Sequence, residues 1–158
     1  MKIEIDTSPT PFALHVIAAD LRPEDRHELA VTREIYDAEE LVRDAFAARH
    51  TYLAVVNLDD VPIFAFGAVP LVGRSFVQGW AFGRPGSYRV LAAVTRHIKK
   101  LMIPRLIELG VQAVQVFSHP DHVRAHIWLR QLGFRLQARV PGIGPRKEEM
   151  FLFIGRAP

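Results

Sequence analysis

Apolar and polar residues alternate at the start of the chain, and helical spacing of apolar residues follows. The alternation of Lys2–Asp6 predicts a first strand. Helices are predicted over Pro11–Asp20 and from Arg22–Arg26 onward, because proline stands early in each and favours a helix start. A third helix is predicted from Asp37, which forms a capping box with Glu40 three residues later.

The middle of the chain has the composition of three successive strands. Tyr52–Leu58 and Val61–Val69 are rich in β-branched and aromatic residues. The turn residues Asp59 and Asp60 join them, so the two segments predict a hairpin. Ser75–Phe82 alternates and predicts the third strand.

A long helix is predicted over Ser87–Leu109, because apolar residues recur along one stripe of it. The stripe consists of Leu91, Val94, Ile98, Leu101 and Leu109. Pro104 lies inside this helix and removes a backbone hydrogen bond, which predicts a bend or a break. Gly110 is expected at the helix C-terminus. Trp80 and Phe82 share one face of the preceding strand, and we expect that face to pack against this helix.

The last third of the chain alternates shorter elements. Val111–Phe117 has the pattern of a strand, and His122–Leu132 has that of a helix ended by Gly133. Arg135–Val140 and Glu149–Ile154 predict two final strands, with a loop rich in glycine and proline between them.

The resulting order is β, α, α, α, β, β, β, α, β, α, β, β. It predicts a single α/β domain over residues 1–158, with a central mixed sheet flanked by helices on both faces. A domain of 158 residues buries enough surface to fold without disulfides or a metal. The absence of cysteine excludes a disulfide framework, a thiolate zinc site and a cysteine nucleophile.

No targeting or membrane segment is expected. The first residues lack a basic stretch followed by an apolar one, so the sequence predicts no secretion by a signal peptide. The longest apolar run, Val61–Val72, is broken by Pro62 and Pro70. It is shorter than the roughly 20 residues that a membrane-spanning helix needs.

Charge is unevenly distributed along the sequence. Residues 1–83 contain 7 Lys and Arg against 13 Asp and Glu, a net charge of −6, whereas residues 84–158 contain 13 against 4, a net charge of +9. The two values sum to the net charge of +3 of the whole chain. The basic half indicates an anionic partner, or else pairing between the two halves of one domain.

Three strands, a long helix, a strand and a helix ending in a Leu-Gly-Phe turn resemble the GNAT (Gcn5-related N-acetyltransferase) fold. The segment Ala125–Phe134, which ends in Leu132-Gly133-Phe134, is similar to the family's helix before the sixth strand. The resemblance covers roughly Thr51–Ile154. It implies a sheet that holds acetyl-CoA in active members.

The chain also resembles a narrower group, the GNAT-like proteins of tailed phages, including internal virion proteins of short-tailed phages. Three segments carry this likeness: Asp20–Arg26, Gly67–Pro70, and Ile127–Leu129 with the following Gln131–Phe134. The resemblance implies a virion or assembly role, other virion proteins as partners of the basic half, and a location in the virion or the host cytoplasm.

The cofactor loop departs from the family pattern. Active members have a Gln/Arg-x-x-Gly-x-Gly/Ala loop whose N–H groups hold the pyrophosphate of acetyl-CoA at the start of the long helix. Here Pro85 lacks an N–H, and Gly86 is the one glycine between Arg84 and the helix. If acetyl-CoA binds, the resemblance places it at Gly86, Ser87, Tyr88 and Arg89, with Arg84 at the rim.

The catalytic positions depart as well. Many members have a tyrosine five residues before the phenylalanine as general acid, and Leu129 stands there in this chain. The predicted strand Ser75–Phe82 offers no carboxylate as general base. Tyr88 and His119 are the candidate substitutes, since a histidine can accept a proton near neutral pH.

A metal site is not predicted. His122 and His126 share a helix face, but Val123 stands where a His-Glu-x-x-His motif has its glutamate.

Three functions follow from these observations. The favoured one is a phage-type GNAT-fold virion or assembly component without acetyl transfer and without a cofactor. The alternative is an acetyl-CoA-dependent N-acetyltransferase. A nucleic-acid contact module ranks third, because only the basic half supports it.

Overall fold

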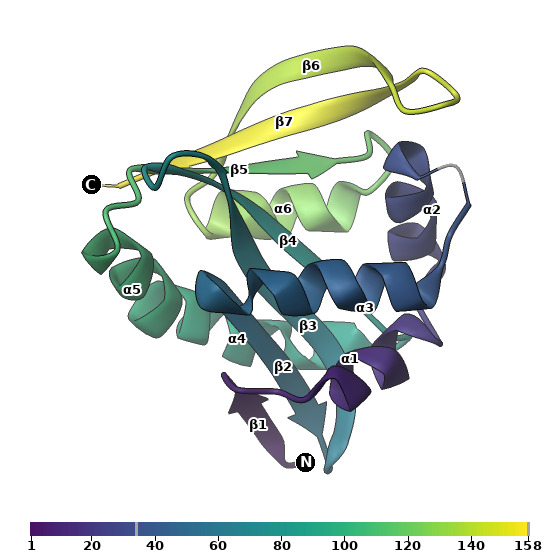
Figure 1. The fold of residues 1–158 in the computed structure, drawn as a ribbon, viewed down its shortest axis with the longest axis vertical. Helices are drawn as coiled ribbons and strands as arrows, with labels where there is room; N and C mark the ends of the chain where they lie inside the picture. Colours follow the sequence, from purple (N-terminus) through teal and green to yellow (C-terminus); the bar gives the residue numbers. More distant parts are fainter. Residues whose placement is uncertain (34, 158) are drawn as a thin grey trace.

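The computed structural model describes residues 1–33 and 35–157, in which a seven-stranded sheet carries helices on both faces (Figure 1). The strands are β1 (Ile3–Asp6), β2 (Tyr52–Leu58), β3 (Val61–Val72), β4 (Phe76–Gly83), β5 (Ala113–Ser118), β6 (Arg135–Ile143) and β7 (Glu148–Arg156). They lie in the order β1-β2-β3-β4-β5-β7-β6. The pair β4 and β5 is parallel and the other pairs are antiparallel, which confirms the predicted mixed sheet.

The helices occur where the sequence predicts them. They are α1 (Pro11–Ala18), α2 (Pro23–Thr32), α3 (Ala38–Ala47), α4 (Leu91–His97), α5 (Ile103–Glu108) and α6 (Val123–Gln131), with a 3₁₀-helix at Ala48–His50. Asp37 caps α3, since its carboxylate accepts a 2.9 Å hydrogen bond from the N–H of Glu39. Gly133 has φ 93° after α6, and there the N–H of Phe134 donates to the carbonyl of Leu129. No helix in the described part of the chain is long and apolar enough to span a bilayer.

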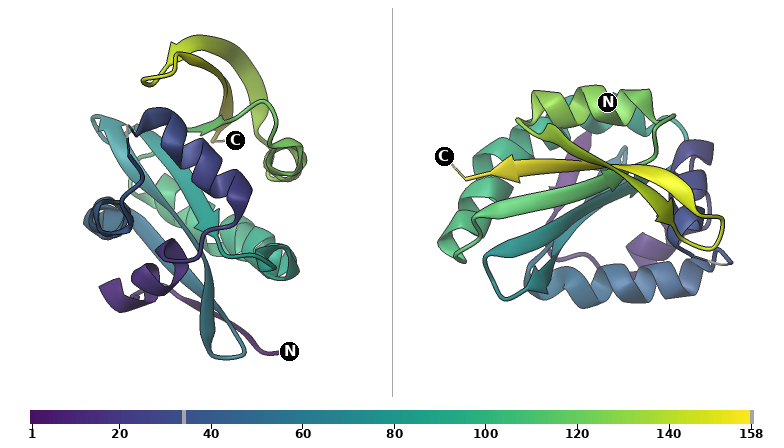
Figure 2. Two further views of the ribbon diagram at one scale, coloured as in Figure 1. Left: turned by 90° about the vertical axis from the view of Figure 1, so that its right-hand side faces the viewer. Right: turned by 90° about the horizontal axis from the view of Figure 1, so that it is seen from above.

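Helices cover both faces of the sheet (Figure 2), and an apolar core lies on each face. On one face, Leu14 of α1 and Leu41 of α3 pack against β2 and β3. On the other face, Val94 of α4 and Leu106 of α5 pack with Phe64 of β3. Burial of these side chains is the main stabilising contribution to the fold.

The prediction for Trp80 and Phe82 is wrong. Both lie in the core formed with α1 and α3, and Val77 instead faces the long helical region with Val94. Alternation along a strand separates two faces, but it does not say which face a later helix covers.

The predicted long helix is divided into segments. A 3₁₀-helix over Ser87–Val90 leads into α4, and a π-helical segment at Ile98–Met102 separates α4 from α5. Pro104 lies in the first turn of α5, where its missing N–H is tolerated. The interruption predicted from Pro104 is present, and the π segment directly before it takes up the break.

The π segment shifts the buried stripe by one residue. Met102 and Leu106 are 6% and 2% exposed, whereas Leu101 is 57% exposed and Leu109 is 36% exposed. The prediction that Leu101 and Leu109 belong to the core is therefore wrong. A constant period of 3.6 residues fails where the helix gains an extra residue in one turn.

The sheet opens between β4 and β5. Their pairing joins Phe76–Gln78 to Ala113–Gln115. Beyond it β4 continues to Gly83 and β5 to Ser118 with no pairing between them among the described residues. This opening positions the site described next.

Candidate functional site at the opening between two strands

A pocket of about 270 Å³ lies where the start of the α4 region, the N-terminus of α2 and the first turn of α6 meet. Backbone and side chains of Gly86, Ser87 and Tyr88 form one wall. Arg22, Arg124 and His122 add basic groups to the lining and outnumber its one acidic residue, Glu24, and Trp128 also lines the pocket. An anionic group is the ligand that this charge favours.

Part of the predicted cofactor site lines this pocket. Gly86, Ser87 and Tyr88 do so, and Tyr88 is 63% exposed. Arg84 does not, because its guanidinium donates to Asp20 at 3.1 Å and to the carbonyl of Pro62 at 3.4 Å. Arg89 folds back, and its Nε donates to the carbonyl of Gly86 at 3.3 Å. The role of these five residues in CoA binding stays a prediction.

Two N–H groups of the loop before α4 donate hydrogen bonds to carbonyls of the same loop. The N–H of Ser87 donates to the carbonyl of Arg84 at 3.1 Å, and that of Arg89 donates to Gly86 at 3.2 Å. Pro85 has no N–H to offer. Two of the N–H groups at this helix start are therefore bonded within the loop and Pro85 offers none, which reduces the set available to a bound pyrophosphate.

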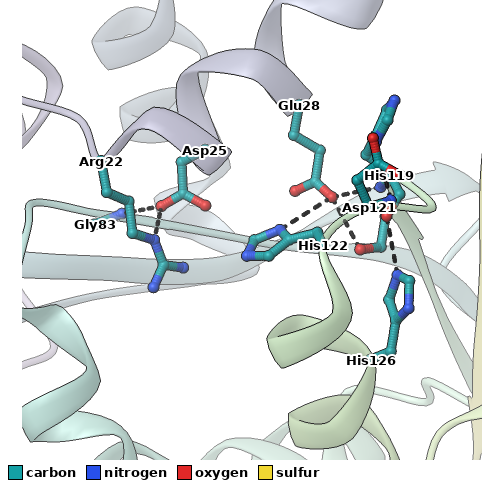
Figure 3. A network of polar contacts seen from close by, with 9 residues as sticks. Arg22, Asp25, Glu28, Gly83, His119, Asp121, His122 and His126 are labelled. Carbon is teal, nitrogen blue, oxygen red and sulfur yellow. Dashed lines mark hydrogen bonds and ion pairs between the residues drawn. The ribbon is translucent and has the colours of Figure 1, made fainter.

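The open edge of β4 ends at Gly83, and α2 covers it there (Figure 3). Asp25 accepts a 2.7 Å hydrogen bond from the N–H of Gly83, and the N–H of Arg22 donates to the carbonyl of Gly83 at 2.9 Å. Asp25, which is 2% exposed, also pairs with the guanidinium of Arg22. Burial raises the pKa of Asp25 above its usual range, although Arg22 and the Gly83 hydrogen bond oppose the shift.

A second buried pair joins α2 to the loop after β5. One oxygen of Glu28 accepts hydrogen bonds from the Ser118 hydroxyl at 2.9 Å and the His119 N–H at 2.6 Å, and it lies 3.4 Å from Nδ1 of His122. Burial alone would raise the pKa of Glu28, but His122 and these hydrogen bonds lower it. Burial would lower the pKa of His122, but Glu28 and Asp25 raise it.

The two pairs form one network. The ring of His122 lies between Glu28 and the Arg22–Asp25 pair (Figure 3). Because Nδ1 faces Glu28 and His122 lines the pocket, this residue can exchange a proton with a bound group there. The sequence analysis missed Arg22, Asp25, Glu28 and His122 as site residues. Part of this network could have been found from the sequence, because Asp25 and Glu28 stand three residues apart on one face of a polar helix.

His119, the histidine predicted as a candidate catalytic residue, lies outside the pocket lining. His119 is 3.5 Å from Glu148 through Nε2, and its Nδ1 accepts a hydrogen bond from the N–H of Asp121 at 3.2 Å. His126 donates from Nε2 to the carbonyl of His119 at 3.0 Å and packs on Phe151. Burial lowers the pKa of His126, so it acts as a neutral structural group.

A leucine and a tryptophan occupy the α6 side of the opening. Leu129, at the family's tyrosine position, is 5% exposed and carries no proton to transfer. Trp128 bridges α6 to α4, since its Nε1 donates to the hydroxyl of Thr95 at 2.8 Å. Its ring stands edge-on to Phe64 at 6.0 Å. This bridge joins the two helices, and a groove of about 740 Å³ lies between them, lined by Thr95, Ile127 and Trp128 among others.

Comparison with known proteins supports the fold. No protein-family pattern matches the chain, and no curated protein matches it in sequence. Three solved structures illustrate the similarity. Ard1 from Thermoplasma volcanium has a TM-score of 0.74 at 11% identity, covering 100% of this chain and 99% of that one. Aminoglycoside 6′-acetyltransferase type Ii has a TM-score of 0.69 at 16% identity, covering 100% and 99%.

The third is YncA of Salmonella typhimurium, assigned as an acetyltransferase and solved with its cofactor acetyl-CoA. Its TM-score is 0.67 at 13% identity, covering 98% of this chain and 93% of that one. Identities this low show the fold and leave the activity open. The seven-stranded sheet that opens between β4 and β5, flanked by helices on both faces, is the GNAT acetyltransferase fold.

Proposed function

We propose that this chain is a GNAT-fold component of a tailed-phage virion, or of its assembly, that does not transfer acetyl groups. One observation carries the second half of the proposal: Asp25 and Arg22 occupy both backbone groups of Gly83 at the open edge of β4. An extended ligand that enters the opening would need that edge for hydrogen bonds. The chain supplies those partners itself.

Two further features support the absence of acetyl transfer. The N–H groups of Ser87 and Arg89 are already bonded within the loop, which reduces the donors available to hold a pyrophosphate. Leu129 is buried at the position of the family's general acid. Together these features weaken both the hold on a pyrophosphate and the transfer of a proton to a leaving thiolate.

The basic second half supports a role in assembly. Arg and Lys side chains form one ion pair between residues 1–83 and residues 84–158 in the described part of the chain, that of Arg84 with Asp20. Arg96, Lys99 and Lys100 are exposed on the helical region, with no ion pair among the described residues. Their charge is available for an acidic surface of another virion protein. The location that follows is the virion or the host cytoplasm.

Mass spectrometry of purified particles and of the remaining lysate tests this proposal. The expected result is enrichment of the protein in gradient-purified particles at a fixed ratio to the capsid protein. Recovery of the protein only in the particle-free lysate would contradict an assembly role.

One observation favours the alternative function, an acetyl-CoA-dependent N-acetyltransferase. The pocket beside Gly86 is basic and contains His122 oriented by Glu28, an arrangement that suits a general base. An assay of acetyl-CoA turnover with amine acceptors, comparing the protein with its His122→Gln variant, tests it. Turnover that the variant loses would favour the enzyme over the assembly component.

A further inference from the structure

Two histidines and a glutamate from three separate elements converge beside the polar network. His27 lies on α2, His119 in the loop after β5, and Glu148 at the start of β7. Nε2 of His27 and Nε2 of His119 each lie 3.5 Å from the same oxygen of Glu148. One ligand atom of each residue lies within 4.8 Å of the other two.

From this arrangement we propose that His27, His119 and Glu148 form a binding site for a divalent transition metal, with Zn²⁺ as the ion it fits best. Zinc bonds to imidazole nitrogen and carboxylate oxygen at about 2.0–2.2 Å, so two ligand atoms of one tetrahedral ion lie about 3.3–3.5 Å apart. Both distances to Glu148 agree with that separation.

The chemistry of the donor set favours the same kind of ion. Two imidazoles and one carboxylate select zinc and its neighbours over Mg²⁺ and Ca²⁺, which prefer ligands that are all oxygen. The two imidazole rings stand edge to face with centroids 4.4 Å apart. One divalent ion between them can bind both rings and the carboxylate of Glu148.

The exposure of the three side chains suits a site with an open position. His27 is 50% exposed, Glu148 25% and His119 13%. Three protein ligands leave a fourth position of a tetrahedral ion for water or for a group from a partner.

Asp121 is placed to support the proposed ion. Its carboxylate lies 3.8 Å from Nδ1 of His119, which accepts the N–H of Asp121 in this structure. Metal binding at Nε2 requires the ring proton on Nδ1, so the Asp121 N–H gives up its hydrogen bond to Nδ1 and the exposed Asp121 carboxylate accepts one from Nδ1 instead. A bound ion would join α2, the loop after β5 and β7, which suits a site that stiffens this end of the molecule.

The neighbouring group of Asp25, Glu28 and His122 does not compete as a site. Its carboxylates already accept hydrogen bonds from Gly83, Ser118 and His119 and pair with Arg22. A cation there would displace these partners and lie beside a fixed positive charge.

Calorimetric titration of tag-free protein, stripped of metal with chelator, tests the inference with Zn²⁺ alone. We expect one ion per chain with an affinity in the micromolar range or tighter. The affinity should fall at least 100-fold in His27→Ala and in Glu148→Gln, and about 10-fold in Asp121→Asn, the lower end of the effect of losing such a supporting residue. His15→Ala, on the exposed face of α1, is the matched histidine control and should bind like the parent protein.

Thermal unfolding gives an independent readout. Stoichiometric Zn²⁺ should raise the melting temperature of the parent protein and of His15→Ala but not of His27→Ala, because only a site in the folded chain links binding to stability. Absence of one-to-one binding by the parent protein would overturn the inference. Binding that survives both His27→Ala and Glu148→Gln would overturn it as well.

Discussion

Asp25 accepts a 2.7 Å hydrogen bond from the backbone N–H of Gly83, although 58 positions separate the two residues in the chain. The bond fixes the N-terminus of α2 on the open edge of β4. It also leaves a carboxylate that is 2% exposed dependent on two partners, Gly83 and Arg22. Stability and the closure of the opening therefore depend on the same side chain.

Asp25→Ala should destabilise the fold by about 3–5 kcal/mol, because the partly buried charge of Arg22 and the N–H of Gly83 lose their partner. Urea unfolding followed by circular dichroism measures this. Asp20→Ala is the control: it removes an exposed pair with Arg84 and should cost less than about 1 kcal/mol. Equal effects of the two substitutions would show that the Asp25 bonds contribute little.

Met102→Asp should destabilise the protein by more than about 3 kcal/mol, since it places an unpaired carboxylate in the core. Leu101→Asp should be tolerated, because Leu101 is 57% exposed and Met102 is 6% exposed. Thermal unfolding of the two variants compares neighbouring positions with the same chemistry. The reverse order of stabilities would contradict the register that the π segment sets.

The Glu28–His122 pair should stabilise the fold most in mildly acidic solution. The pKa of His122 is raised above its ordinary value of 6.5, so its contribution is complete below 6.5 and is lost as the pH rises through the raised value. The pKa of Glu28 is lowered from 4.5, so its contribution is present above 4.5 and is lost as the pH falls through the lowered value.

Unfolding free energies of the parent protein and His122→Gln, measured from about pH 5 to about pH 9, test this window. The difference between the two proteins should be larger near the acidic end than near the alkaline end. Comparing the two proteins removes most of the contributions of Asp25 and His126, because burial, the main cause of both pKa shifts, is left in place by the substitution. A difference that grows with pH would contradict the assigned pair.

Reversal of the exposed basic face should affect assembly without affecting folding. The triple change Arg96→Glu, Lys99→Glu and Lys100→Glu should leave the melting temperature nearly unchanged, since these side chains are exposed. It should reduce the amount of protein in purified particles several-fold, because like charges repel across an interface. Arg43→Glu, on the exposed face of α3, is the control and should incorporate normally.

The elements themselves could be predicted because their signals are local. The β-branched and apolar residues of Tyr52–Leu58 and the capping residue Asp37 lie within a few positions of the elements they determine. Which residues of the long helical region are buried could not be predicted, because Pro104 and the packing of Met102 determine this together. A periodic pattern has no means to place an extra residue in one turn.

The polar network could not be predicted for a different reason. Glu28 and His122 lie 94 positions apart, and their contact depends on how α2 is placed over the end of the sheet. Sequence spacing carries no information on such a contact. Gly86, Ser87 and Tyr88 line one pocket because they are consecutive in the loop before α4, and their role in binding acetyl-CoA stays a prediction.

Calorimetric titration with acetyl-CoA tests the central claim most directly. The account predicts no saturable binding up to about 1 mM, a limit that corresponds to about −4.1 kcal/mol, because Asp25 and Arg22 occupy Gly83 and the loop before α4 bonds to itself. The same sample should unfold cooperatively, which shows that it is folded. Saturable one-to-one binding of acetyl-CoA within that range would contradict the account and favour the acetyltransferase.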